Sequence, residues 1–128
     1  MIVEFILYVA DQNRSRDFYF KILGKNPILD VPGMTEFDLG ENCKLGLMPE
    51  RGIAKILNKK TPHPSTGNGI PRCELYLYTD DIEYSFKTSL ENGAKEISEI
   101  QTRDWGDIVG YVADYDGHII AFAKKITL

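Results

Sequence analysis

The chain has 128 residues, the size of one domain, with 43% hydrophobic and 27% charged residues, as is usual for soluble proteins. Its net charge of −4 gives no electrostatic footprint for nucleic acid, and no apolar run approaches the roughly 20 residues of a membrane span. No signal peptide is recognisable, and Cys43 and Cys73 lack metal-type spacing, so we expect a reduced cytoplasmic protein.

The first half of the chain is predicted to form a strand, a helix and three further strands. Residues 2–9 alternate like a half-buried strand, and Asp11 is a suitable N-cap for the helix that follows. This helix should end at Gly24, because glycine favours the position after a helix. The three later strands are expected at residues 25–31, 35–39 and 43–48.

Residues 50–72 are predicted to join the two halves. Ile53, Ile56 and Leu57 indicate a short amphipathic helix. A loop rich in Pro, Gly and Ser follows over residues 61–71, and it is either a binding loop or a plain linker.

The second half repeats the order of the first. A strand at residues 73–79 leads to Asp80 or Asp81 as the N-cap of a helix that runs to Glu91. Strands are expected at residues 94–101, 107–113 and 118–125. The last two are joined by an Asp-Gly turn, which is a strong hairpin signal.

The first strands of the two halves are similar in sequence. EFILYVAD, which begins at Glu4, returns as ELYLYTDD at Glu74, 70 positions later. Alternation along a strand places Glu4, Ile6 and Tyr8 on one face, and it does the same for their counterparts in the second copy. A carboxylate at the same point of both copies indicates the wall of a cleft, because an unpaired buried carboxylate is costly. The alternative is that both carboxylates lie at strand ends in solvent.

Short sequence motifs in this order resemble the vicinal oxygen chelate superfamily, which includes glyoxalase I, bleomycin-resistance proteins and extradiol dioxygenases. The motifs are Tyr8–Asp11, Arg14-Ser15, Phe18-Tyr19, Leu23-Gly24, Gly93-Ala94, Trp105-Gly106 and Asp114–His118. In the last motif Tyr115 stands where the family usually has Pro.

The resemblance implies an α+β domain over residues 1–128, in which two tandem β-α-β-β-β modules form a curled mixed sheet around a central cleft. Module one would be residues 1–49, the connecting segment 50–72, and module two 73–128. Proteins of this superfamily are commonly homodimers, sometimes with modules exchanged between chains.

Four positions of the resemblance correspond to metal ligands in the metal-using members: Glu4, Gly46, Glu74 and Ala121. Gly46 and Ala121 cannot bind a metal, and His63 and His118 match no ligand position. Transition metals need three or more N, O or S ligands, so we expect no metal cofactor beyond a weakly held Mg²⁺ or other divalent cation on Glu4 and Glu74.

A degenerate metal site is similar to that of the bleomycin-resistance branch, whose members bind a drug without chemistry. We therefore expect a small-molecule binding protein without nucleic-acid or membrane partners, whose two carboxylates and aromatic rings favour a cationic or amine-bearing ligand. The expected ligand-binding residues are Glu4, Tyr8, Gly46, Met48, Glu74, Tyr76, Tyr78, Trp105 and Ala121. Any of the tyrosines could instead fill the core.

Two other functions stay open at this point. A lyase or isomerase of the glyoxalase-like type could use Glu4 or Glu74 as a general base, because two close carboxylates raise one pKa. A structural or regulatory dimer without a small ligand is the third alternative. The sequence carries no nucleophile motif and no phosphate-binding glycine loop.

Overall fold

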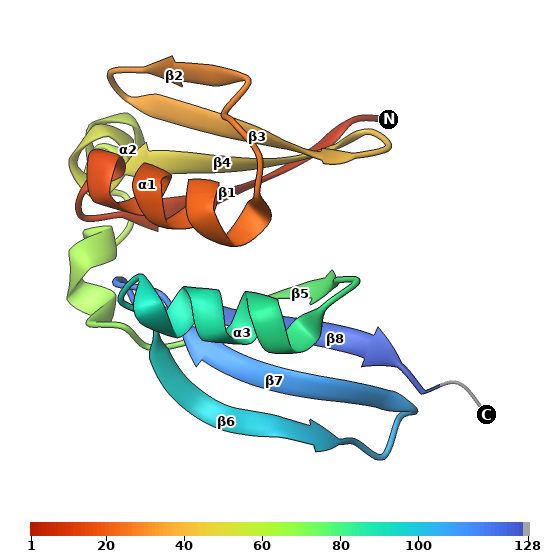
Figure 1. Ribbon diagram of the computed structural model, residues 1–128. Helices are drawn as coiled ribbons and strands as arrows, with labels where there is room; N and C mark the ends of the chain where they lie inside the picture. The colour runs from red at the N-terminus through yellow and green to blue at the C-terminus, as the bar shows by residue number, and fades with distance from the viewer. Residues whose placement is uncertain (127–128) are drawn as a thin grey trace. The chain divides into compact units, whose positions relative to one another are not determined.

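The computed structural model describes residues 1–126, which divide between two compact units, Met1–Asn68 and the chain from Gly69 onward. Each unit contains one strand–helix–three-strand module (Figure 1). The elements of the first unit are β1 (Val3–Val9), α1 (Gln12–Leu23), β2 (Leu29–Val31), β3 (Met34–Gly40), β4 (Cys43–Pro49), α2 (Glu50–Leu57) and the 3-10 helix η1 (Pro64–Gly67). Those of the second are β5 (Glu74–Tyr78), α3 (Ile82–Glu91), β6 (Lys95–Thr102), β7 (Asp107–Ala113) and β8 (Ile119–Lys125).

Both modules have the same sheet topology. The strand orders are β1-β4-β3-β2 and β5-β8-β7-β6. In each sheet the first strand pairs in parallel with the last, and the remaining pairs are antiparallel. Two four-stranded mixed sheets with helices confirm the predicted α+β class and the strand–helix–three-strand repeat.

Helix α1 begins and ends where its capping residues place it. The Asp11 carboxylate accepts a hydrogen bond from the backbone N–H of Arg14 at 3.0 Å, and Gly24 closes the helix with a φ of 64°. Its apolar stripe buries Phe18, Tyr19 and Ile22. Burying one such side chain contributes about 1.5–3 kcal/mol, so this stripe holds the helix on the sheet.

Each sheet has one face covered by the helix of its own module. In the first module Phe37, Leu45 and Leu47 are fully buried on this covered face. In the second, the ring of Phe86 on α3 lies over Gly110, where a Cβ would come within 2.7 Å of it. Figure 1 shows α1 and α3 each running along its own sheet.

Two features of the first unit differ from the sequence prediction. The strand predicted at residues 25–31 is restricted to Leu29–Val31, because Pro27 has no N–H for a strand ladder. The loop over residues 61–71 contains η1, which the sequence did not indicate. The short amphipathic helix indicated by Ile53, Ile56 and Leu57 is present as α2, which starts at Glu50 directly after β4. No helix within residues 1–126 is long and apolar enough to cross a membrane.

Candidate functional site

The open face of the first sheet is the face opposite α1, and it carries Glu4, Glu36 and Lys44. Strand register places Ile6, Gly46 and Glu36 in one row across β1, β4 and β3. Glu4, Lys44 and Asp38 form the next row. The side chains of this open face include Glu4, Ile6, Tyr8, Met34, Glu36, Asp38, Lys44 and Met48, together with Gly46.

The Glu4 carboxyl group lies directly beside the backbone of Gly46. A Cβ at residue 46 would lie 2.5 Å from Oε2 of Glu4, 3.1 Å from Cγ1 of Ile6 and 3.4 Å from Sδ of Met34. Any side chain at this position would therefore push the carboxyl group off β4. Glu4 therefore covers Gly46, which the sequence predicted as a ligand-binding residue.

The environment of Glu4 favours its neutral form. Burial is the largest effect on Glu4, and it raises the pKa of this group above its ordinary value of 4.5. A hydrogen bond with the Glu36 carboxyl group and the negative charge of Glu36 raise this pKa further, whereas the Lys44 ammonium lowers it. Oε2 of Glu4 is buried and accepts no hydrogen bond from residues 1–126 when both carboxylates are ionised. Lys44 lies 3.8 Å from Glu36, whose side chain is 16% exposed. The open face therefore holds a carboxyl pair that lacks a donor.

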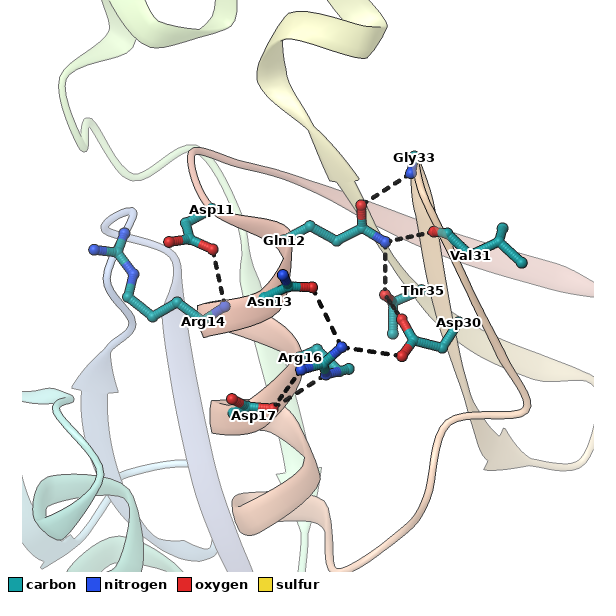
Figure 2. A network of polar contacts seen from close by, with 10 residues as sticks. All are labelled: Asp11, Gln12, Asn13, Arg14, Arg16, Asp17, Asp30, Val31, Gly33 and Thr35. Atoms are coloured by element: carbon teal, nitrogen blue, oxygen red, sulfur yellow. Dashed lines mark hydrogen bonds and ion pairs between the residues drawn. The ribbon is translucent and has the colours of Figure 1, made fainter.

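The β2–β3 hairpin, which carries Met34 to this face, is fixed by Gln12 at the start of α1 (Figure 2). The Gln12 amide donates to the Val31 carbonyl at 2.8 Å and to the buried Thr35 hydroxyl at 2.9 Å. Its Oε1 accepts from the Gly33 backbone N–H at 2.9 Å. The hairpin is thus held at a fixed position on the helix.

The open face of the second sheet carries a hydrogen-bonded group that we name the aromatic platform: Tyr76, Tyr78, Trp105, Asp107 and Lys125. Both phenols donate to Oδ2 of Asp107, at 2.6 Å from Tyr76 and 2.7 Å from Tyr78. The Trp105 indole N–H donates to the Tyr76 hydroxyl at 2.9 Å, and the Lys125 ammonium donates to the Tyr78 hydroxyl at 3.3 Å. Every donor direction is fixed, because a carboxylate only accepts and an ammonium or indole only donates.

These bonds set the protonation states of the aromatic platform. Hydrogen bonds from Tyr76 and Tyr78 lower the pKa of Asp107, which is 4% exposed. Burial, followed by the bond to Asp107, raises the pKa of Tyr76 to about 12. Asp107 is therefore ionised and Tyr76 is neutral near pH 7. A carboxylate with a lowered pKa is a weak base, so Asp107 is poorly suited to general-base chemistry at that pH.

The floor of this second face is apolar and closed. Ala121 and Ala123 are fully buried, and the rings of Tyr76 and Tyr111 pack on them with Val109. The rings of Tyr76 and Tyr111 therefore cover Ala121, which the sequence predicted as a ligand-binding residue. Tyr78 and Trp105 are 54% and 60% exposed, so their rings are the accessible part of the platform.

Residues 2–127 match the family model of the glyoxalase-like domain. The chain belongs to this glyoxalase-like family. The match confirms the resemblance to the vicinal oxygen chelate superfamily that the sequence motifs suggested.

Several proteins of known sequence or structure are similar to this chain. An uncharacterised protein of Mycobacterium tuberculosis is 26% identical over 115 residues, which cover 88% of this chain and 67% of that protein. A glyoxalase-related enzyme from Fulvimarina pelagi has a TM-score of 0.80 at 18% identity, covering 96% of this chain and 86% of that one. An antibiotic-binding protein from a Streptomyces species has a TM-score of 0.69 at 22% identity, covering 98% and 96%.

The predicted site residues of this glyoxalase-like domain fall on two separate faces. Glu4, Tyr8, Gly46 and Met48 share the open face of the first sheet, and Tyr76, Tyr78 and Trp105 meet in the aromatic platform of the second. Glu74 is exposed at the start of β5. Sequence reasoning missed Glu36 and Asp107, which the strand register places beside the predicted residues. Alternation along β3 contained a signal for Glu36, because it shares a strand face with Asp38. Asp107 had no such signal, because it shares its strand face with Val109 and Ala113.

The family's metal-ligand positions do not fit a transition metal in this chain. Burial and the neighbouring Glu36 raise the pKa of Glu4, which opposes the ionised form that a metal needs, and Gly46 and Ala121 offer no ligand atom. Within residues 1–126 one group of three metal-type ligands lies together, at Asp114, Asp116 and His118. Oδ1 of Asp114 already accepts the backbone N–H groups of Asp116 and His118 at 2.9 Å, which shapes the β7–β8 turn.

Proposed function

We propose that this glyoxalase-like protein binds a small cationic or amine-bearing molecule on the open face of its first sheet, at the Glu4–Glu36 carboxyl pair. The observation that carries the proposal is Oε2 of Glu4, a buried acceptor without a donor beside a second carboxyl group. A buried acceptor left unsatisfied costs about 1–3 kcal/mol, and a ligand N–H group would remove this cost.

An ammonium group suits this pair better than a neutral donor. With both carboxylates ionised the pair has two negative charges, and Lys44, at 3.8 Å from Glu36, balances one of them. An ammonium group would balance the other and replace the proton that burial and the neighbouring Glu36 keep on Glu4. Ile6 and Met34 beside Gly46 supply apolar contact for the rest of the ligand.

The aromatic platform supports ligand binding on the second module independently. Tyr78 and Trp105 expose flat rings whose edges are held by hydrogen bonds, and rigid rings lose little entropy when a ligand stacks on them. Lys125 lies 4.7 Å from the centre of the Tyr78 ring, so one face of this ring already holds a cation. The antibiotic-binding neighbour from Streptomyces shows that this fold can hold a small molecule.

The test compares tryptamine with tryptophol, its neutral analogue with a hydroxyl in place of the amine. Amide chemical shifts of the full chain, followed during titration, give both the affinity and the face that is bound. We expect tryptamine to bind the first sheet at least about tenfold more tightly than tryptophol. Glu4→Gln and Glu36→Gln should each remove this preference, and Glu41→Gln, an exposed carboxylate in the β3–β4 turn, should keep it. A preference unchanged in both variants would refute the carboxyl pair as the site.

A glyoxalase-like lyase or isomerase is the second candidate, and the raised pKa of Glu4 favours it. A carboxyl group with a raised pKa is a stronger base near neutral pH, and Glu4 would take a proton from a carbon next to a carbonyl group. Incubation of hydroxyacetone or other small carbonyl compounds with the protein in D₂O tests this role. Deuterium incorporation that Glu4→Gln abolishes would support an enzyme, and no incorporation above buffer would exclude this chemistry for those compounds.

We further propose that the protein works as a homodimer in the cytoplasm. Strand β1 is an edge strand of its sheet, and it exposes Phe5 at 60% and Ile6 at 40%. Exposed apolar edges favour association with another chain. Cys43 and Cys73 are both free thiols, as in a reducing compartment.

A further inference from the structure

A cavity of about 350 Å³, which we name the basic pocket, is lined by none of the residues of either open sheet face. It is formed between α2 and the segment that leads into η1, within the first unit. Its lining residues are Arg51, Ala54, Lys55, Leu57, Asn58, Lys59, Thr61, Pro62 and His63. The volume is within the range of small-molecule sites.

The charge of the basic pocket is opposite to that of the chain. Its lining contains Arg51, Lys55, Lys59 and His63 and no carboxylate, although the protein has a net charge of −4. Within residues 1–126, none of the three Lys and Arg side chains of the pocket forms an ion pair. Cations gathered without counter-charges attract an anion.

Local helix stability does not explain this arrangement. Arg51 is in the first turn of α2, where the helix dipole disfavours a positive charge. Lys55 lies one turn further on the same side, so two like charges repel at the unfavourable i, i+4 spacing. Only Lys55, in the last turn, is placed favourably for the dipole.

The backbone after α2 adopts a costly conformation that directs Lys59 to the pocket. Asn58 and Lys59 have consecutive positive φ values of 51° and 61°. Asn tolerates this region, whereas Lys rarely adopts it. Such backbone strain in residues other than glycine is frequent at functional sites.

His63 adds a hydrogen-bond donor of fixed identity. Its Nδ1 accepts the backbone N–H of Ser65 at 3.2 Å and lies 2.8 Å from the Ser65 hydroxyl. Because a backbone N–H only donates, the neutral imidazole carries its proton on Nε2. The Nε2–H group of His63 can therefore donate a hydrogen bond to an anion.

From these observations we infer that the basic pocket is a second ligand site, which binds a small organic anion with one carboxylate or phosphate group on a short apolar body. Arg51, Lys55 and Lys59 bind the anionic group, with His63 as a further donor. Ala54, Leu57 and Pro62 contact the apolar body. The site selects the charge opposite to that selected by the Glu4–Glu36 pair, so the two sites are tested separately.

The experiment titrates the isotope-labelled full chain with benzoate, phenyl phosphate, benzyl alcohol and inorganic phosphate. We expect benzoate or phenyl phosphate to shift the amides of residues 51–63 saturably, and benzyl alcohol to leave them unchanged. Preference for one of the two anions identifies the head group. Binding should weaken severalfold between about 50 and about 300 mM salt, because the charges are near solvent. If inorganic phosphate binds as tightly as phenyl phosphate, Ala54, Leu57 and Pro62 do not contact an apolar part of the ligand, and this part of the inference is refuted.

A pair of charge-matched variants makes the test specific. The pocket variant is Lys55→Gln with Lys59→Asn, in which Asn suits the positive φ at position 59. The control is Lys21→Gln with Lys87→Gln, which removes the same charge outside the pocket. The pocket variant should bind about tenfold more weakly and the control within about twofold of the original chain. Equal weakening in both, with circular dichroism showing both folded, would overturn the inference.

Discussion

Two carboxyl groups on the open sheet faces, the half-buried Glu4 and the buried Asp107, differ in what surrounds them. Glu4 lies beside another carboxyl group over the bare backbone of Gly46, and this environment raises its pKa. Asp107 accepts two phenol hydrogen bonds, and these lower its pKa. Oε2 of Glu4 has no hydrogen-bond donor among the described residues, whereas Asp107 already accepts two hydrogen bonds. For this reason we place the cationic ligand at Glu4.

The two groups should give opposite dependence of stability on pH. The folded chain keeps the Glu4 proton above the ordinary pKa of 4.5, so the free energy of unfolding falls as pH rises from 4.5 through the raised pKa. Asp107 loses its proton below the ordinary 3.8, so its contribution is present above 3.8 and is lost as pH falls through the lowered pKa.

Urea denaturation at a series of pH values measures both effects. Glu4→Gln should flatten the fall on the higher-pH side, and Asp107→Asn should flatten the loss on the acidic side. A Glu4→Gln profile that coincides with the original above pH 4.5 would show that Glu4 is not perturbed by folding.

Gly46→Ala tests the position of the Glu4 carboxyl group beside the backbone of Gly46. The new methyl group meets Oε2 of Glu4 at 2.5 Å, and this atom is the far end of a flexible side chain, so we expect Glu4 to move away with a change of less than about 1 kcal/mol in the free energy of unfolding. The preference for tryptamine over tryptophol should fall, because Glu4 is displaced. Gly52→Ala, where a Cβ meets nothing within 4 Å, is the matched control in α2.

At the scale of elements, the caps were predictable and the strand register was not. Asp11, Gly24 and Asp81 mark helix ends by local chemistry alone, and the structure confirms all three boundaries within one residue. Glu36 and Asp107 reach their partners through strands that are distant in sequence. Their role depends on register, which local patterns specify only weakly, and so the sequence pointed to Glu4 and Glu74 as the pair instead.

The turn after α2 predicts a conflict between stability and binding. Lys59→Asn relieves the positive φ of 61° and should raise the free energy of unfolding by about 0.5 kcal/mol, while it weakens benzoate or phenyl phosphate binding in the basic pocket. Thermal denaturation and the amide titration measure the two quantities on one variant. A less stable variant would argue against strain at this turn.

At the scale of the whole molecule, exposed apolar residues on β1 predict self-association. Phe5→Glu places a charge on an edge strand and should shift a dimer to monomer in sedimentation at micromolar concentration. Tyr84→Glu is a control, because Tyr84 is 67% exposed on helix α3 and belongs to no strand edge. A chain that is monomeric before any substitution would contradict the homodimer.

The most direct test of the central proposal is the number of protons released when tryptamine binds. Calorimetric titrations near pH 5 in two buffers of different ionisation enthalpy give this number, at a pH slightly above the ordinary value of 4.5. Because the ammonium group would replace the proton that burial and the neighbouring Glu36 keep on Glu4, we predict proton release in the original chain and none in Glu4→Gln. Binding heat that is independent of the buffer, or release that persists in Glu4→Gln, would contradict the carboxyl pair as the binding site.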